Sequence, residues 1–400
     1  MIIDSLSVKT SVSLRASVLT GDLDFDALVS EWDVLLEQSD QRVFFLRWAW
    51  NRLWWRLLRP PDSQLFIITC RDEQDHLVGL APFYLRQRRT AGIPHLRELL
   101  FLGTGIYAQT SEYLDIVARR GYERVVADAI VDCLQRSDDW DRLRLEKIPA
   151  SSVMLTLVQG ALGDGSEIEV CDRSYYVDTT VGWETFISGL SNSARNNALR
   201  RTRRLFASHN CRLQRIETGA QLEGAMDALV RLHQARWQSK GEPGTFALPN
   251  VEEFLKEAMG ISLGEQRLGL TTLDVDGATA AVRLDFLDNR IAHAFQAGFD
   301  PAYANEGLGS VMNALCIKTY IEDEQILEYD LMAGSPVYKE SWTREYREIV
   351  SLTLDRQGVR SKAYRSIEMA KGIGRSFLRA TVPEPIRLAG HRLITQRHYK

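Results

Sequence analysis

The sequence lacks the hallmarks of several large protein classes. Its five cysteines are scattered and never form a CxxC pair, so neither a disulfide framework nor a zinc site is supported, and we expect no metal. No stretch approaches the ~18 consecutive apolar residues of a membrane-spanning helix. Residues 1–20 contain no basic segment followed by an apolar core, the pattern of a signal peptide. We therefore expect a cytoplasmic protein with buried, reduced thiols.

The composition is that of an ordinary globular protein. Of the 400 residues, 45% are hydrophobic and 26% are charged, and nine Trp, thirteen Tyr and fourteen Phe supply apolar surface for two substantial cores. At roughly 150 residues per domain, this length predicts two to three domains. The net charge of −4 excludes a generally basic, nucleic-acid-binding chain, although the charge is unevenly distributed.

Helices and strands alternate in the first half of the sequence. Apolar residues at helical spacing predict a helix over residues 25–38 and an aromatic-rich helix over residues 44–58. We interpret the tryptophans of the second helix as packing against a sheet, with Arg47, Arg52 and Arg56 facing outward. Strands are predicted at residues 64–71, 77–86, 99–103, 113–118 and 142–147, with a helix at residues 122–133.

A similar order of elements follows in the second half. Asp276-Gly277 and Asp288-Asn289 are typical two-residue hairpin turns, which predicts an antiparallel meander of three strands. Strands that alternate with helices predict an α/β fold, here α+β with a mixed sheet, and two copies of one fold. Helices are predicted at residues 183–190, 194–208, 222–238, 251–259 and 307–322, and strands at residues 267–275, 278–287, 290–298, 326–331 and 349–354.

The segment from Phe299 to Ser310 gives the clearest sign of chemistry. A predicted strand ends here, a polar loop follows, and residues 307–310 (Gly-Leu-Gly-Ser) open a helix. Glycines at a helix start let backbone N–H groups turn toward one point, and the partial positive charge of the helix end favours a phosphate there. On composition alone, an ordinary helix start is an equal interpretation.

This segment resembles the acyl-CoA-binding loop of the GNAT acyltransferase superfamily, which reads Q/R-x-x-G-x-G/A. Residues 304–309 (Ala-Asn-Glu-Gly-Leu-Gly) match both glycines, whereas Ala304 stands in place of the usual Gln or Arg. The resemblance implies that acetyl-CoA or another acyl-CoA is the co-substrate. Its implied contacts are Asn305, Gly307, Leu308, Gly309 and Ser310.

A second stretch, residues 330–342, is similar to the D-x-x-x-G-x-x-x-Y-K-x-x-W pattern of FemAB-like (CelD-type) acyltransferases, a group that includes proteins linked to bacterial cellulose and exopolysaccharide biosynthesis. Residues 44–50 and 190–205 also resemble this group. The resemblance implies two GNAT-like acyl-CoA N-acyltransferase domains in tandem. They would be a degenerate domain at residues 20–178 and an acyltransferase domain at residues 179–356, followed by a basic tail at residues 357–400.

The resemblance and the residue types suggest catalytic roles for three side chains. In GNAT enzymes a tyrosine in the region of Tyr338 often donates the proton to the departing thiolate, and Tyr338 is the candidate here. Asp330 ends a predicted strand and is a candidate base or substrate-orienting group, or else it caps the turn around Gly334. His293 is a candidate base, with a structural histidine as the alternative. Trp342 is expected in the core.

Three further residues are candidates for substrate binding. Arg283 and Asp285 alternate onto one face of a predicted strand, and His293 would lie on the neighbouring strand if that face borders the cleft. Lys339 could contact a phosphate or carboxylate, or simply be solvated.

Two basic segments point to anionic partners. The run Arg195–Arg204 carries five arginines and no acidic residue, which favours an anionic contact, with a solvated helix as the alternative. Residues 359–400 have a net charge of +8. This charge suggests either attachment to an anionic membrane surface, at the inner face of the membrane, or docking of the tail on the acidic body of the protein.

Together these features predict acyl-CoA-dependent transfer to an amine or hydroxyl of a sugar, nucleotide sugar or other polar acceptor, in envelope or exopolysaccharide biosynthesis. Direct attack is expected, because no covalent-nucleophile motif is present. One alternative is a FemAB-type aminoacyl-tRNA-dependent peptidyltransferase that binds tRNA through Arg195–Arg204; otherwise we expect no nucleic-acid partner. The other is a non-catalytic GNAT-like scaffold in a polysaccharide assembly, which Ala304 favours.

Overall fold

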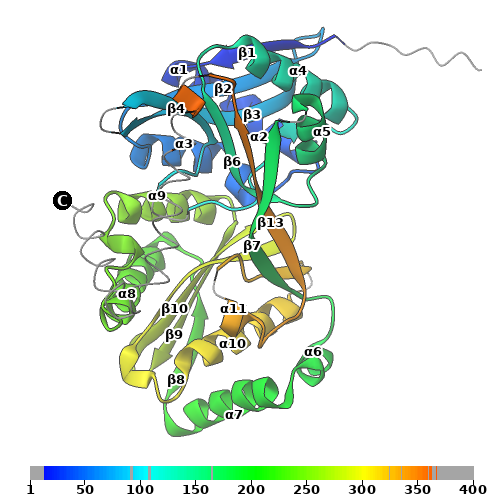
Figure 1. The fold of residues 1–400 in the computed structure, drawn as a ribbon. Coiled ribbons are helices and arrows are strands. Elements are labelled where there is room, and N and C mark those ends of the chain that lie inside the picture. Colours follow the sequence, from blue (N-terminus) through cyan, green and yellow to red (C-terminus); the bar gives the residue numbers. More distant parts are fainter. Residues whose placement is uncertain are drawn as a thin grey trace, which may run out of the picture.

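The computed structural model describes residues 13–90, 93–106, 110–163, 165–323, 325–334, 336–358, 360–362 and 366. It shows an N-terminal half and a C-terminal half, joined by two long strands (Figure 1). The tail predicted at residues 357–400 lies almost entirely outside the described residues.

Helices cover both faces of the sheet in the N-terminal half. Gly79 approaches Val126 on one face, whereas Tyr84, of opposite parity in the same strand, contacts Trp54 on the other face with ring centroids 5.3 Å apart. The elements are β1 (Arg15–Leu19), α1 (Asp22–Ala27), α2 (Val29–Glu37), η1 (Phe44–Leu46), α3 (Trp48–Leu57), β2 (Ser63–Arg71), β3 (Leu77–Thr90), β4 (Ile93–Phe101), β5 (Val117–Ala118), α4 (Glu123–Arg136), β6 (Arg142–Pro149) and α5 (Val153–Leu162).

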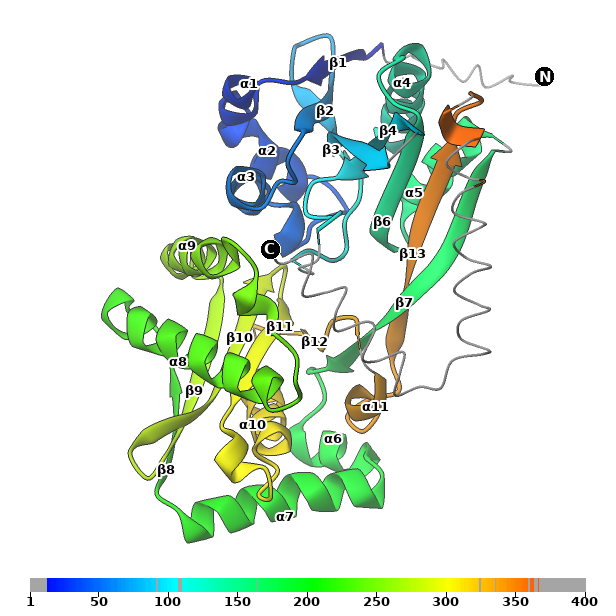
Figure 2. The ribbon, with the colours of Figure 1, turned by 60° about the vertical axis from the view of Figure 1, so that its left-hand side comes forward.

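In the C-terminal half, α8 packs on one face of the sheet and α10 on the other, while α7 lies along α10 at the far end of the molecule (Figures 1 and 2). The elements are β7 (Ser166–Asp178), α6 (Trp183–Gly189), α7 (Asn192–Ser208), β8 (Cys211–Arg215), α8 (Gly219–Gln238), η2 (Thr245–Ala247), α9 (Val251–Gly264), β9 (Leu268–Val275), β10 (Ala278–Asp288), β11 (Ile291–Phe299), η3 (Pro301–Tyr303), α10 (Leu308–Glu322), β12 (Glu328–Asp330), α11 (Pro336–Lys339) and β13 (Tyr346–Asp355).

One mixed sheet runs through both halves, in the order β1-β2-β3-β4-β6-β13-β7-β12-β11-β10-β9-β8, with β5 paired to β3. The pairs β4/β6 and β11/β12 are parallel, and the other named pairs are antiparallel. The predicted α/β class with a mixed sheet is thus confirmed.

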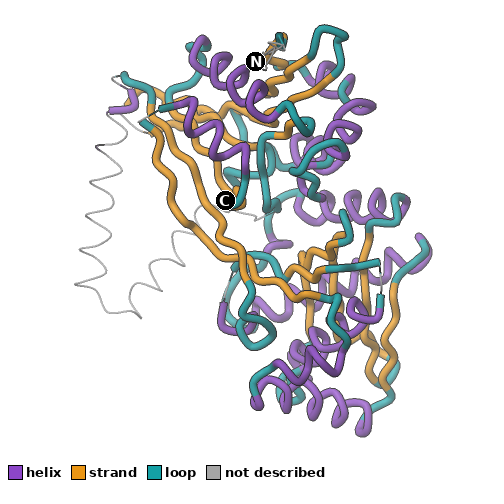
Figure 3. Tube along the Cα trace, turned by 90° about the vertical axis from the view of Figure 1, so that its right-hand side faces the viewer, coloured by secondary structure: helices purple, strands orange, loops and turns teal. Residues whose placement is uncertain are grey.

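The long strands β7 and β13 connect the two halves (Figures 2 and 3). β7 pairs with β12 through Tyr176–Asp178 and with β13 along the rest of its length, and β13 in turn pairs with β6. The predicted boundary at residue 178 coincides with the end of β7. However, β13, which the prediction placed in the second domain, is hydrogen-bonded into the sheet of the first half.

Three local predictions need correction. The second hairpin turn is centred on Asn289 and Arg290, with φ of 48° and 62°, because Asp288 still pairs with Ile291 inside the ladder. The strand predicted at residues 113–118 is only Val117–Ala118 long, since the polar residues before it are buried in an irregular loop. Among the cysteines, Cys171 is exposed on β7, so the thiols are not all buried.

The aromatic helix α3 buries three of its tryptophans and partly buries Trp48, in line with the prediction, but Arg47 does not face outward. Only 5% of Arg47 is exposed, and its Nε and Nη2 donate to Oδ2 and Oδ1 of Asp288 at 2.5 and 2.8 Å. Arg267 donates to the same carboxylate at 2.7 Å. Burial raises the pKa of Asp288, but Arg47 lowers it by more, so the net shift is downward. A buried charge pair therefore links α3 to the β10–β11 hairpin.

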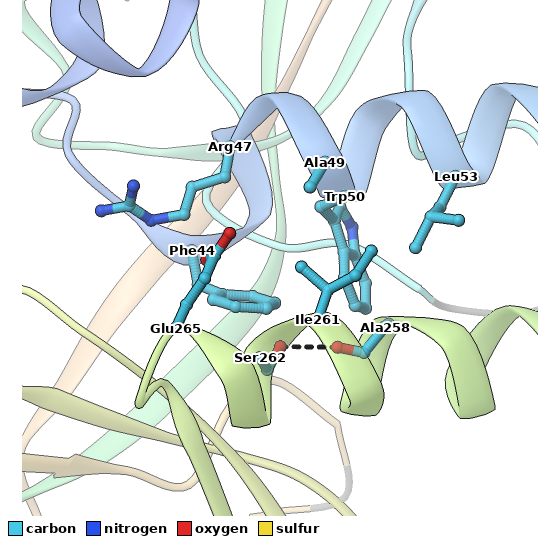
Figure 4. Close-up of a pocket in the computed structure, with 9 residues that line it drawn as sticks. All are labelled: Phe44, Arg47, Ala49, Trp50, Leu53, Ala258, Ile261, Ser262 and Glu265. Carbon is cyan, nitrogen blue, oxygen red and sulfur yellow. Dashed lines mark hydrogen bonds between the residues drawn. The ribbon is translucent and has the colours of Figure 1, made fainter. Parts of the chain in front are cut away.

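Apolar contacts accompany this ion pair between the halves. Phe44 stacks on Phe286 with ring centroids 4.3 Å apart, and Trp50 meets Phe254 of α9 edge to face. Figure 4 shows the small crevice that remains between α3 and α9, with Ile261 facing Trp50. The two halves thus pack through large side chains.

Replacing Arg47 by methionine should lower the free energy of unfolding by about 3–5 kcal/mol, because it leaves the buried Asp288 with fewer partners. Urea unfolding followed by tryptophan fluorescence measures the loss. Arg120→Met is the matched control: its pair with Asp40 is more than half exposed, so its loss should stay below about 1 kcal/mol. Equal losses in both variants would contradict a stabilising role for the buried pair.

Candidate functional site

The candidate site lies where β11 and β12 diverge. The two strands are paired only from Ile291–Glu328 to His293–Asp330; β12 then ends, whereas β11 continues to Phe299. A β-bulge leaves Phe295 without a partner on β10 just beyond this point. At bulges and where strands separate, backbone N–H and C=O groups are left without the hydrogen bonds that they form inside a sheet.

The N-terminus of α10 follows β11 and offers free backbone donors. Gly307 caps the helix with φ of 67°, in the left-handed region that favours glycine. The N–H groups of Leu308 and Gly309 have no partner within the described part of the chain. The Leu308 side chain is buried, so only its backbone is available, while Asn305 is exposed and Ser310 is half-buried. These donors fit an anionic group such as a pyrophosphate.

Arg201 of α7 covers this helix end, a position that nothing in the sequence indicated beyond the arginine run. A Cβ added to Gly307 would collide with the guanidinium and Cδ of Arg201, so glycine lets this side chain lie directly against the helix end. No hydrogen bond or ion pair joins Arg201 to an acidic side chain among the described residues. A guanidinium and a helix N-terminus are both positive, so an anion between them is stabilised by both.

Tyr338 lies in the short helix α11, and 44% of it is exposed. Arg236 of α8 and Arg283 of β10 interact with it electrostatically: burial lowers the pKa of Arg236, and Tyr338 counteracts this shift. A tyrosine hydroxyl that is accessible and beside two arginines can exchange a proton with a bound ligand.

Arg283 and Asp285 form a buried network on the α10 face of the sheet. Asp285 accepts hydrogen bonds from Arg283 Nε at 2.9 Å, from Tyr320 at 2.8 Å and from Tyr329 at 3.2 Å. Burial raises the pKa of Asp285, and these donors oppose the shift. The Tyr320 hydrogen bond ties α10 to the sheet, and the Tyr329 hydrogen bond joins β12 to β10. Substrate binding by Asp285 would have to compete with all three donors.

The structure does not place His293 on the same face as Arg283 and Asp285. His293 pairs with Phe286, the strand neighbour of Asp285, and alternation turns it toward the N-terminal half. There its ring centroid lies 5.5 Å from that of Phe45 and 6.0 Å from that of Tyr113. The three predicted residues therefore do not form one cluster.

His293 and Asp330 lie opposite each other in the last β11–β12 pair, and both are 1% exposed. His293 Nδ1 is 3.5 Å from Asp330 Oδ2. Asp330 Oδ1 accepts from Ser174 at 3.0 Å and from the Met332 N–H at 2.7 Å, so Asp330 does cap the turn after β12. Burial raises the pKa of Asp330, but His293 and Tyr113 lower it by more.

Lys339 is buried rather than solvated. Its Nζ donates to the carbonyl oxygens of Met332 and Ala333 at 2.6 Å each, and burial lowers its pKa to about 8. Glu112, from the N-terminal half, accepts from the Ala333 N–H at 2.8 Å. Lys339 and Glu112 thus hold the β12–α11 turn from two sides.

Sequence reasoning missed Glu112 and its neighbours in residues 110–116. Every residue of this loop is buried, including Thr110, Ser111 and Asp115. The run Thr-Ser-Glu-Tyr-Leu-Asp does not alternate between polar and apolar residues as a half-buried strand would. This break in the pattern is the only feature of the sequence that indicates an irregular loop here. Consecutive polar residues that are buried without regular structure indicate specific tertiary contacts.

The described residues contain no group of three or more His, Cys, Asp or Glu side chains arranged to hold a metal ion. Over the same part of the chain, no helix combines the length and hydropathy needed to cross a bilayer.

Residues 192–340 match the family model of the acetyltransferase (GNAT) domain. No curated protein is similar enough in sequence to count as a match. Among solved structures, FemX has a TM-score of 0.60 at 9% identity, over 88% of this chain and 100% of that chain.

Two further structures have TM-scores of 0.51 at 11% identity. They are L-PGS from Bacillus licheniformis, which matches over 86% of this chain and 96% of its own, and the C-terminal domain of a protein assigned as a lysylphosphatidylglycerol synthetase from Agrobacterium fabrum, over 85% and 95%. At these identities the likeness shows a shared fold. The mixed α/β fold of this chain is therefore GNAT-like.

The buried loop should make stability depend on pH through Asp115. Burial raises the pKa of Asp115 to about 7, while Ser152 and the Ile116 N–H counteract part of the shift. Between about pH 4 and pH 7 the folded state then binds more protons than the unfolded state, so rising pH lowers the free energy of unfolding. About three pKa units correspond to roughly 4 kcal/mol.

Urea unfolding of wild type and Asp115→Asn across this pH window isolates the effect, because the other carboxyl groups titrate in both proteins. The stability of wild type relative to the variant should decline as pH rises from about 4 to about 7. A constant difference across the window would contradict the raised pKa of Asp115.

Proposed function

We propose that this protein transfers an acyl group from acyl-CoA to an amine or hydroxyl of a sugar, nucleotide sugar or other polar acceptor. The observation that carries the proposal is the N-terminus of α10, where Gly307, two free N–H groups and Arg201 converge at the end of the loop that follows β11. The match of residues 192–340 to the GNAT domain model supports the reaction class. The similarity of residues 330–342 to FemAB-like acyltransferases supports a role in envelope or exopolysaccharide biosynthesis.

The residues present fit the pyrophosphate of an acyl-CoA, which would supply the activated thioester. The N–H groups of Leu308 and Gly309 would hold the phosphate oxygens, with Ser310 and Asn305 beside them. Arg201 would provide the charged contact that Ala304 cannot, since a guanidinium binds phosphate in a bidentate manner. The missing Gln or Arg of the loop is therefore replaced from a different helix.

Proton transfer would be divided between two faces of the site. Tyr338, exposed and near Arg236, would protonate the departing thiolate, while His293, held by Asp330, would accept the proton of the acceptor. Arg283 would orient the ligand near Tyr338, with which it interacts electrostatically. Lys339 would keep the β12–α11 turn in place.

Calorimetric titration with acetyl-CoA and longer acyl-CoAs tests the proposal directly. Wild type should bind in the micromolar range, and Arg201→Gln should weaken binding about tenfold, because one charged hydrogen bond to phosphate contributes about 1.5 kcal/mol. Arg203→Gln is the matched control, since Arg203 is exposed on another face of α7. No binding by folded wild type would overturn the acyl-CoA assignment and favour a scaffold.

Tyr338→Phe should lower kcat about 10²–10⁴-fold with little change in acyl-CoA affinity, because only the proton donor is removed. Thiol release with a panel of amino sugars and polyols as acceptors measures the rate. Tyr346→Phe is the control, since Tyr346 is a similarly exposed tyrosine on β13. An unchanged rate in Tyr338→Phe would exclude Tyr338 as the acid.

The arginines of α7 support a second candidate, an aminoacyl-tRNA-dependent peptidyltransferase. Residues 192–215 contain seven arginines and no acidic residue, and the only ion pair of these arginines within the described residues joins Arg215 to Asp323 at 3.8 Å. Like charges at i, i+4, such as Arg200 and Arg204, are unfavourable in a helix unless an anion is near. Binding of tRNA that weakens steeply with salt would favour this candidate.

A further inference from the structure

A small set of buried polar atoms at the junction of the two halves forms no hydrogen bond with any described residue. These atoms are the Tyr113 hydroxyl, both ring nitrogens of His293, and Oδ2 of Asp330. Tyr113 is 7% exposed, and the other two residues are 1% exposed. His293 Nδ1 and Asp330 Oδ2 form an ion pair at 3.5 Å but no hydrogen bond. A buried polar atom without a hydrogen bond is destabilising, so a ligand group that supplies the missing hydrogen bonds would be stabilised here. We call these three side chains the junction chamber.

The backbone around the junction chamber is strained. Tyr113, Lys147 and Met332 have φ of 56°, 66° and 63°, in the left-handed region that non-glycine residues rarely adopt. Glu112 links them, because it accepts from the Ala333 N–H and lies 3.7 Å from Lys147 Nζ. Strain of this kind persists only where the surroundings enforce it, and it concentrates at functional sites.

The junction chamber lies at the point where β11 and β12 separate. His293 and Asp330 form the last pair before the strands diverge, and His293 faces the N-terminal half, on the side of the sheet opposite α10. A ligand held at the α10 N-terminus and a ligand held in the chamber would therefore approach the strand opening from opposite faces. Direct attack requires the acceptor atom and the thioester carbon to meet within about 3–3.5 Å at this opening.

We propose that the junction chamber receives the reactive hydroxyl or neutral amine of the acceptor, so that Tyr113 and the N-terminal half form part of the active site. This inference rests on the proposed acyl transfer. His293 would take the proton as the acceptor atom bonds to the acyl carbon; the C–S bond then breaks, and the thiolate receives a proton from Tyr338. Tyr113 and Asp330 Oδ2 would hydrogen-bond the acceptor group, which has both a donor and lone pairs.

Ethanolamine, which carries both a hydroxyl and an amine, is a suitable probe. With saturating acetyl-CoA, it should accelerate thiol release by wild type and shift the His293 ring resonances, assigned by comparison with His293→Gln. The rate should fall about 10²-fold in His293→Gln and about tenfold in Tyr113→Phe. Tyr84→Phe is the matched control: its buried hydroxyl donates to the Thr104 carbonyl, far from the chamber, and the rate should be unchanged.

Acetyl-CoA titration of the same variants separates this inference from the proposed function. Unchanged CoA affinity with the expected loss of rate supports the junction chamber. Two results would overturn the chamber but leave the acyl-CoA assignment intact, provided that CoA binds normally. One is that ethanolamine changes neither the rate nor the His293 resonances. The other is that Tyr113→Phe retains the wild-type rate. If wild type does not bind acetyl-CoA at all, the proposed function itself is overturned.

Discussion

The short parallel pairing of β11 with β12 is the constraint on which the rest of the site depends. The ladder stops at His293–Asp330, and beyond it the two strands carry their chains to different places: β11 toward the loop that opens α10, and β12 into the turn that carries Tyr338. A longer ladder would pair these backbone groups with each other. Because the pairing ends early, β11 is free to continue to Phe299 and the loop before α10, while β12 leads into the turn before α11.

The second dependence is electrostatic, because buried charges hold the two halves in register. Asp288 is shared by Arg47 of the first half and Arg267 of the second, and Glu112 reaches across to the Ala333 N–H. Such groups are stable only while their partners stay in place, since an unpaired buried charge is strongly unfavourable. The N-terminal half, expected to be degenerate, therefore contributes directly to the geometry of the turn beside the site.

Local patterns predicted much of the fold. Helical spacing located α3, α4 and α8, and turn chemistry located the Asp276-Gly277 hairpin, because these signals depend on neighbouring residues alone. The irregular loop at residues 110–116 and the partner of β13 were not predictable in this way. Both depend on contacts between residues more than one hundred positions apart, such as Glu112 with Ala333 and β13 with β6.

For the candidate site, the sequence by itself determined the chemistry available: a glycine-opened helix, a tyrosine after the last short strand, and an arginine run without acids. Only the tertiary structure decided which of these groups meet. In the folded chain, Arg201 contacts Gly307, and His293 lies on the face of the sheet opposite Arg283 and Asp285. Tyr113 is buried beside Asp330. The physical reason is that backbone propensity and periodicity act over a few residues, whereas burial and pairing of charges are satisfied only when distant segments pack together.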